Sequence, residues 1–195
     1  MSRFYEKELP QGYTEALIID ANDKKSSLKI RIAAAAVTAV LINLIFFLYV
    51  LPRFSAVKNG FSVIKCLVLI VSYFVYVILH ELTHGAVYKL LTKQKLTYGF
   101  KPPAAFCGVP DIYVYRITSL MSLLAPFTIF SVLFAVLFFV IPDPFSKMLV
   151  LLMFSLHLTG CAGDLYGAGL LLFRFKNPET LRKDTGPKQI YYTKD

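Results

Sequence analysis

The chain has 195 residues, of which 56% are hydrophobic and only 17% are charged, with a formal net charge of +9. This composition excludes an ordinary soluble domain, which carries a larger share of charged residues. The sequence therefore predicts one compact integral membrane protein with no separate soluble domain.

Four apolar runs are long enough to cross ~30 Å of hydrocarbon as helices. They are Ile30–Leu51, Ser62–Tyr88, Ile117–Ile141 and Met148–Phe173. The expected fold class is an all-α integral membrane protein with four transmembrane helices. The expected organisation is a cytoplasmic N-terminal tail over residues 1–29, the transmembrane domain over 30–173 and a cytoplasmic C-terminal tail over 174–195.

The distribution of basic residues predicts the orientation. Six Lys or Arg residues precede Ile32, five lie between the second and third runs, and six follow Phe173, whereas the other two loops hold three and one. Because cytoplasmic loops carry an excess of Lys and Arg, we expect both termini and the middle loop in the cytoplasm, with the protein in the cell membrane. The positive charge suits anionic lipid headgroups of the bilayer and is not interpreted as a nucleic-acid site.

The first run begins near residue 30 and lacks a small-residue cleavage site, so we expect it to be retained as a helix and not removed as a signal peptide. Its one strongly polar residue, Asn43, is interpreted as a hydrogen-bonding contact to a neighbouring helix. The three cysteines lack C-x-x-C spacing, and no disulfide framework is expected.

The second run contains His80-Glu81-Leu82-Thr83-His84. On a helix, residues i and i+4 share a face, so His80 and His84 can present two imidazole nitrogens to one tetrahedral Zn²⁺. Glu81 lies beside that face, where its carboxylate can act as general base on a water molecule.

The alternative is a chance pattern with two core histidines. The chain has only three histidines, and Glu81 is the one Asp, Glu, Lys or Arg between Cys66 and Tyr88, which favours the metal site. At 1.5 Å per residue, His84 lies ~7 Å and His80 ~13 Å inside the cytoplasmic edge at Lys89.

The middle loop runs from Lys89 to Arg116. Its segment Tyr98–Pro110 is rich in aromatic residues, Pro and Gly, and Ile112–Tyr115 favours β structure. These signals fit a hairpin at the membrane interface, whose exposed edge could receive an extended peptide. A simple connector with interfacial anchors fits them equally well.

The third run lacks ionisable residues and is interpreted as scaffold, whereas the fourth carries His157, Cys161 and Asp164. A catalytic zinc site needs a third protein ligand. Asp164 lies ten residues before Arg174, hence ~15 Å inside and level with His80, while His157 lies ~10 Å further away. We therefore expect Asp164 to be the third ligand, brought close to the second helix by packing at Gly163 and Gly167.

These residues resemble the bacterial membrane zincins of a peptidase family with a His-Glu-Leu-x-His-Gly motif, and more distantly the site-2 proteases. The resemblance rests on His80–Gly85, Ala125-Pro126 and Gly163-Asp164. In site-2 proteases, an Asp on a later transmembrane helix completes the zinc site, and by resemblance Asp164 takes that position. The run around Asp164 departs from the longer motif of those proteases.

The sequence thus predicts a membrane zinc metalloprotease with metal ligands His80, His84 and Asp164 and the general base Glu81. Its substrate would be a membrane protein or peptide, cleaved at or within the cytoplasmic half of the membrane. Two alternatives remain open: a non-catalytic metal-binding sensor, transporter or scaffold, and an amide or lipid hydrolase that uses the same site. Glu81 favours catalysis, because a structural zinc site needs no general base.

Overall fold

A computed structural model describes residues 4–20, 23–101 and 104–194, and it combines helices with a β-sheet. The all-α prediction is therefore wrong. The strands are short and mostly rich in charged and tyrosine residues, so they lack the long apolar runs on which that prediction was based. By its internal contacts, the chain divides into two compact units.

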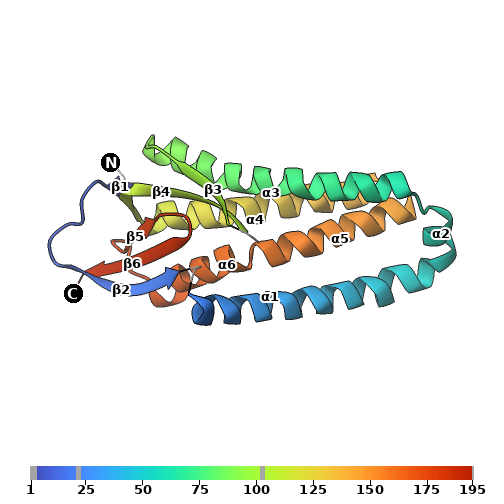
Figure 1. Cartoon of the computed structure of the whole chain (residues 1–195), viewed down its shortest axis with the longest axis horizontal. Coiled ribbons are helices and arrows are strands. Elements are labelled where there is room, and N and C mark those ends of the chain that lie inside the picture. The colour runs from blue at the N-terminus through green and yellow to red at the C-terminus, as the bar shows by residue number, and fades with distance from the viewer. Residues whose placement is uncertain (1–3, 21–22, 102–103, 195) are drawn as a thin grey trace. The chain divides into compact units, whose positions relative to one another are not determined.

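The first unit comprises Met1–Ile30, Ile78–Pro126 and Gly163–Asp195 and holds the sheet. The strands are β1 (Tyr5–Glu6), β2 (Tyr13–Asp20), β3 (Thr97–Lys101), β4 (Ala104–Tyr115), β5 (Leu181–Asp184) and β6 (Lys188–Lys194). Their order is β1-β4-β5-β6-β2, with β3 paired to β4, and every pair is antiparallel (Figure 1). The β3–β4 pairing is the hairpin that the middle loop predicts.

Alternation of side chains explains why the terminal segments form strands. In β6, Tyr191 packs into a core with Leu123 and Leu171, whereas its neighbours Ile190 and Tyr192 pack with Leu181 in a separate cluster. Successive residues of a strand face opposite sides, so β6 buries side chains on both faces of the sheet. The sheet thus takes its strands from the N-terminal segment, the middle loop and the C-terminal segment.

Four helical pieces complete the first unit: the start of α1 (Lys24–Ile45) as far as Ile30, the last part of α3 (Val63–Thr92), the first part of α4 (Arg116–Val140), and α6 (Ala162–Gly169) with a π-helical turn at Leu170–Arg174. Their shared core with β6 includes Leu120 of α4 and Ala168 of α6. Arg116 adds a polar link, because its Nε donates to the Leu171 carbonyl at 2.8 Å.

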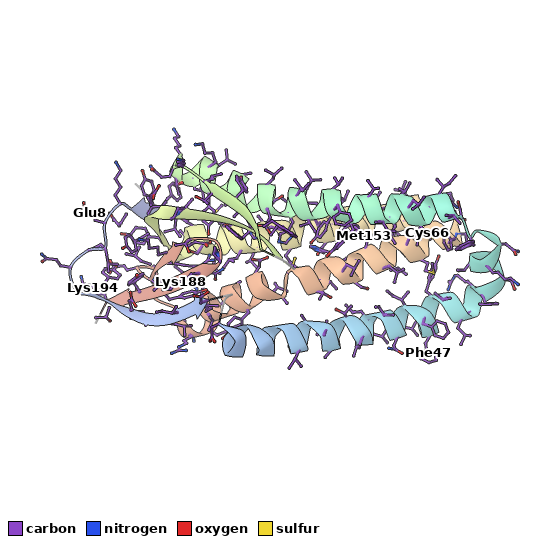
Figure 2. The ribbon with its side chains drawn as sticks, in the orientation of Figure 1. Glu8, Phe47, Cys66, Met153, Lys188 and Lys194 are labelled. Carbon is purple, nitrogen blue, oxygen red and sulfur yellow. The ribbon has the colours of Figure 1, made fainter. Side chains whose placement is uncertain are left out.

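The second unit, Arg31–Val77 and Phe127–Ala162, is helical. It contains α1 (Lys24–Ile45) from Arg31 onward, a π-helical turn (Phe46–Val50), a 3-10 turn (Leu51–Arg53), α2 (Phe54–Asn59), the first part of α3, the last part of α4, and α5 (Pro144–Gly160). Tyr76, Phe130, Phe134 and Met153 form its core, and Met153 is labelled in Figure 2.

Polar contacts fix the helix ends and α1 within the second unit. Asp143 caps α5 by accepting from the Ser146 amide at 2.8 Å, and Lys65 of α3 donates to the same carboxylate at 2.7 Å. These hydrogen bonds lower the pKa of Asp143 to about 2. The sequence predicts that Asn43 bonds to a neighbouring helix, but among the described residues its amide donates to the Ala39 carbonyl of its own helix. The bond between α1 and α5 joins Thr38 and Thr159 instead.

Within the described residues, three helical segments are long and apolar enough to cross a membrane: Ile32–Asn59, Val63–Thr92 and Arg116–Val140. The fourth predicted run is broken at Cys161 into α5 and α6, and it makes a fourth span if the pair counts as one. Gly160 and Gly163 flank the break and are weak helix formers.

Many large apolar side chains on these helices are exposed, such as Phe47 at 59% (Figure 2). All three cysteines are free, including Cys66, which Figure 2 labels.

Candidate metal centre

The two histidines of the motif lie on one face of α3, in the first unit. Both side chains are buried, and their Nε2 atoms are 3.2 Å apart. This proximity follows from the helix itself, because residues four apart are neighbours on its surface.

Asp164 lies in the first turn of α6, and its carboxylate reaches the same point. Its Oδ2 is 3.2 Å from Nε2 of His80 and 3.3 Å from Nε2 of His84. The glycines contribute unequally to this placement. A Cβ on Gly167 would lie 3.2 Å from the Tyr191 hydroxyl and 3.3 Å from Leu123, whereas Gly163 has open space around it. Close packing of α6 therefore depends on Gly167.

The three atoms form a triangle with edges of 3.2, 3.2 and 3.3 Å. A tetrahedral zinc ion with bonds of about 2.1 Å requires distances of about 3.4 Å between its ligand atoms. Two imidazole nitrogens and one carboxylate oxygen are also a donor set that catalytic zinc sites use. Both the spacing and the chemistry of these three residues fit a zinc ion.

A backbone carbonyl orients the ring of His84. The Nδ1 of His84 lies 2.8 Å from the carbonyl oxygen of Ser122 on α4. A carbonyl oxygen can only accept, so Nδ1 carries a proton, and in the neutral ring Nε2 then keeps its lone pair. In that form the lone pair faces an Asp164 oxygen at 3.3 Å, and a cation between these two acceptors would relieve their repulsion.

Glu81 is half-buried on the turn of α3 that carries His80. Electrostatic interactions link its carboxylate to His80, His84 and Asp164. Within the part of the chain that the structure describes, no group hydrogen-bonds to the Glu81 carboxylate. The carboxylate is therefore available to a proton from a water molecule.

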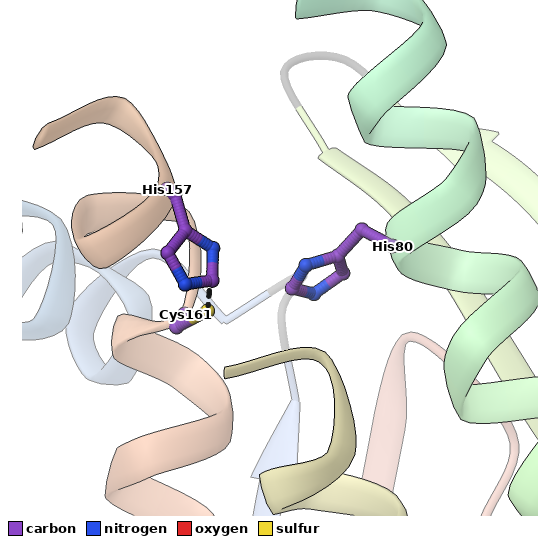
Figure 3. Close-up of side chains that lie close together, drawn as sticks. All are labelled: His80, His157 and Cys161. Carbon is purple, nitrogen blue, oxygen red and sulfur yellow. Dashed lines mark hydrogen bonds between the residues drawn. The ribbon is translucent and has the colours of Figure 1, made fainter. Parts of the chain in front are cut away.

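His157, the third histidine of the chain, belongs to the second unit and has partners of its own there. Its Nδ1 lies 2.9 Å from the Tyr76 hydroxyl and 3.5 Å from Cys161 Sγ, the second contact being drawn in Figure 3. Its Nε2 lies 3.1 Å from the Ser131 hydroxyl. These contacts are those of a hydrogen-bonded core histidine.

Comparison with known proteins identifies the family. A family model described as "putative zincin peptidase" matches residues 73–178, more than half of the chain. The chain belongs to this zincin family. The matched region contains the α3 motif and Asp164, and it confirms the resemblance to a zincin peptidase family that the motif predicts. The more distant resemblance to site-2 proteases stays a prediction. No curated protein and no solved structure matches the chain.

The glycine that follows the zincin motif has a packing role. A Cβ on Gly85 would overlap the hydroxyl of Tyr98 on β3, so the Tyr98 side chain lies against α3 in this position because residue 85 is glycine. Burial raises the pKa of Tyr98, and the neighbouring Cys107 and the Glu81 carboxylate raise it further. Strand β3 therefore lies close to the general base that the motif predicts.

The sequence analysis missed a buried polar cluster beside the zincin motif. Tyr88, one turn after His84, donates to Asp184 Oδ2 at 2.7 Å, and Arg182 Nη2 donates to the same oxygen at 2.9 Å. All three side chains are buried. Arg182 and Asp184 lie on β5, in a segment that the sequence assigns to a tail. The i+4 spacing of Tyr88 from His84 was the one available signal.

This cluster ties the motif helix to the sheet, and Tyr88→Phe should therefore destabilise the protein. The change removes a hydrogen bond to a buried charged group, which contributes about 1.5–3 kcal/mol. Tyr192→Phe is the matched control, because its hydroxyl makes a weaker, partly exposed 3.3 Å bond to Glu15. The free energy of unfolding of each variant is measured in detergent and compared with that of the wild type. Equal losses in the two variants would contradict the role of the cluster.

Proposed function

We propose that this protein is an integral membrane zinc metalloprotease that hydrolyses peptide bonds at or within the cytoplasmic half of the membrane. The observation that carries the proposal is the convergence of His80 Nε2, His84 Nε2 and Asp164 Oδ2 to within 3.3 Å of one another, beside Glu81. Membership of a zincin peptidase family supports the same chemistry.

In this proposal, His80, His84 and Asp164 hold the zinc ion. When bound, zinc polarises the scissile carbonyl and makes water a stronger nucleophile at neutral pH. Glu81 accepts a proton from the attacking water and then donates it to the amine that leaves when the peptide C–N bond breaks. The hydrogen bond to Ser122 holds the imidazole of His84 with Nε2 free to coordinate.

The position of the motif supports a membrane protein or membrane-bound peptide as substrate. The ligands His80 and His84 lie within α3, a segment long and apolar enough to cross the bilayer. Among the described strands, β3 pairs only with β4, which leaves its other edge for an extended peptide. Because Tyr98 of β3 packs on α3 at Gly85, a peptide added there would lie near the motif.

Two alternatives use the same three ligands. A non-catalytic sensor, transporter or scaffold would bind the metal without hydrolysis, and a lipid or small-amide hydrolase would cleave another bond. Glu81 favours catalysis over both structural and transport roles, because a half-buried carboxylate without a hydrogen-bond donor among the described residues suits proton transfer. The peptide-binding edge of β3 favours a peptide over a lipid.

We further propose that both termini and the middle loop lie in the cytoplasm. The three basic segments of the chain each contribute strands to one sheet, as expected for segments on the same side of a membrane. The positive-inside rule assigns that side to the cytoplasm. A reporter that works only in the cytoplasm should therefore be active when it is fused after Asp195. A fusion active only outside the cytoplasm would overturn this orientation.

The ligand assignment predicts different outcomes for two substitutions. Asp164→Ala leaves two histidines and should purify largely free of zinc. The loss of affinity should exceed the ~10–100-fold typical of residues that merely support a ligand. His157→Ala is the control, because its hydrogen bonds lie within the helical unit, and it should keep near-stoichiometric zinc. Metal analysis of both purified proteins tests this, and the reverse pattern would refute the assignment.

The general-base role predicts that Glu81→Gln keeps zinc but loses activity. Glutamine has the shape of glutamate and cannot accept the proton, so hydrolysis of an identified peptide substrate should fall by at least ~10². Zinc content and turnover are measured on the same preparation. Wild-type turnover in the zinc-loaded glutamine variant would exclude the proposed mechanism.

A further inference from the structure

Pro126 interrupts the hydrogen-bond ladder of α4 at one specific carbonyl. The helix runs from Arg116 to Val140 with Pro126 inside it. In an α-helix, the amide of residue i donates to the carbonyl of residue i−4. Proline has no amide hydrogen, and its ring presses against that carbonyl. The carbonyl that Pro126 leaves without its helical partner is therefore that of Ser122.

The Ser122 carbonyl is the one that receives the hydrogen bond from His84 Nδ1, at 2.8 Å. Ser122, His84 and Pro126 are all buried. A buried carbonyl without a partner costs free energy, so the carbonyl released by Pro126 needs a donor from outside its helix. One hydrogen bond therefore gives the Ser122 carbonyl the donor that Pro126 cannot supply and gives His84 Nδ1 an acceptor.

We propose that Pro126 is a positioning residue for the metal centre, acting through the Ser122 carbonyl on His84. This role rests on the proposed function, because it presumes that His84 binds zinc. The released carbonyl holds a proton on Nδ1 of His84 and fixes the ring plane, so that Nε2 of the neutral ring directs its lone pair toward His80 and Asp164.

A purely structural proline would behave differently under substitution. Pro126→Ala restores an amide that competes with His84 for the Ser122 carbonyl. Alanine also favours the helix interior far more than proline does. The positioning role therefore predicts that zinc binding weakens although the metal-free protein is at least as stable as the wild type. A role in packing or bending alone predicts lower stability and unchanged zinc affinity.

The experiment compares full-length wild-type protein, Pro126→Ala and Pro144→Ala in detergent. Zinc affinity is measured by competition with a chelator, and the stability of the metal-free proteins by thermal unfolding. Pro144 is the matched control, because it occupies the first turn of α5, where no helical hydrogen bond is restored. We expect about 10–100-fold weaker zinc binding for Pro126→Ala and wild-type affinity for Pro144→Ala.

A second measurement needs no zinc, and its wild-type result is informative without the variant. The chain has only three histidines, so ¹⁵N NMR of the metal-free, histidine-labelled protein can report the proton position on each ring. The spectrum is read at a pH where the histidine rings are neutral, and there wild-type His84 should carry its proton on Nδ1, whereas Pro126→Ala should shift it toward Nε2. A neutral wild-type His84 protonated on Nε2 would overturn the positioning role even if Pro126→Ala failed to fold.

The outcomes separate this inference from the function on which it rests. Wild-type protein that binds no zinc would overturn both the metal centre and the role of Pro126. Wild-type protein that binds zinc, with equal affinity in Pro126→Ala, would overturn the role of Pro126 alone.

Discussion

The central constraint in this structure is the meeting of one carboxylate oxygen with two imidazole nitrogens. A carboxylate that is partly withdrawn from water is costly unless it is paired, and Asp164 has both histidines within 3.3 Å. In its neutral form, His84 uses its one N–H on the Ser122 carbonyl and offers only the Nε2 lone pair to this carboxylate. A divalent cation satisfies all three groups at once, which is why the arrangement is better explained by a zinc centre than by a hydrogen-bonded cluster.

Several irregularities of the helices make this meeting possible. The break at Cys161 starts a new helix, α6, two residues before Asp164. Gly167 lets α6 approach Leu123 of α4, and Gly85 admits Tyr98 of β3 onto α3. Pro126 removes one helical hydrogen bond and thereby releases the carbonyl that orients His84. The glycines and the proline each cost some helix stability locally, and each allows a close contact around the candidate site.

The sheet connects this site to parts of the chain that are far away in sequence. Arg182 and Asp184 of β5 hold Tyr88, which lies one turn after His84 on the motif helix. Burial disfavours the charge on Arg182, but the carboxylate of Asp184 outweighs this effect and raises the pKa of Arg182. A charged pair in this position is costly to break. The C-terminal strands are therefore a support for the motif helix in the first unit.

The sequence by itself predicted the residues of the candidate site and the family more completely than the fold. The shared face of His80 and His84, the carboxylate of Glu81 beside it and the zincin family follow from local pattern, because helical periodicity places those side chains without tertiary information. Depth counting also placed Asp164 level with His80. The sheet escaped prediction because a strand such as Leu181–Asp184 has only four residues, of which one is apolar, and strands of the sheet pair with partners up to about 180 residues away. Only the tertiary structure decided that Arg182 and Asp184 are buried, that Gly167 and not Gly163 carries the close packing, and that the carbonyl released by Pro126 meets His84, since each depends on a contact between distant segments.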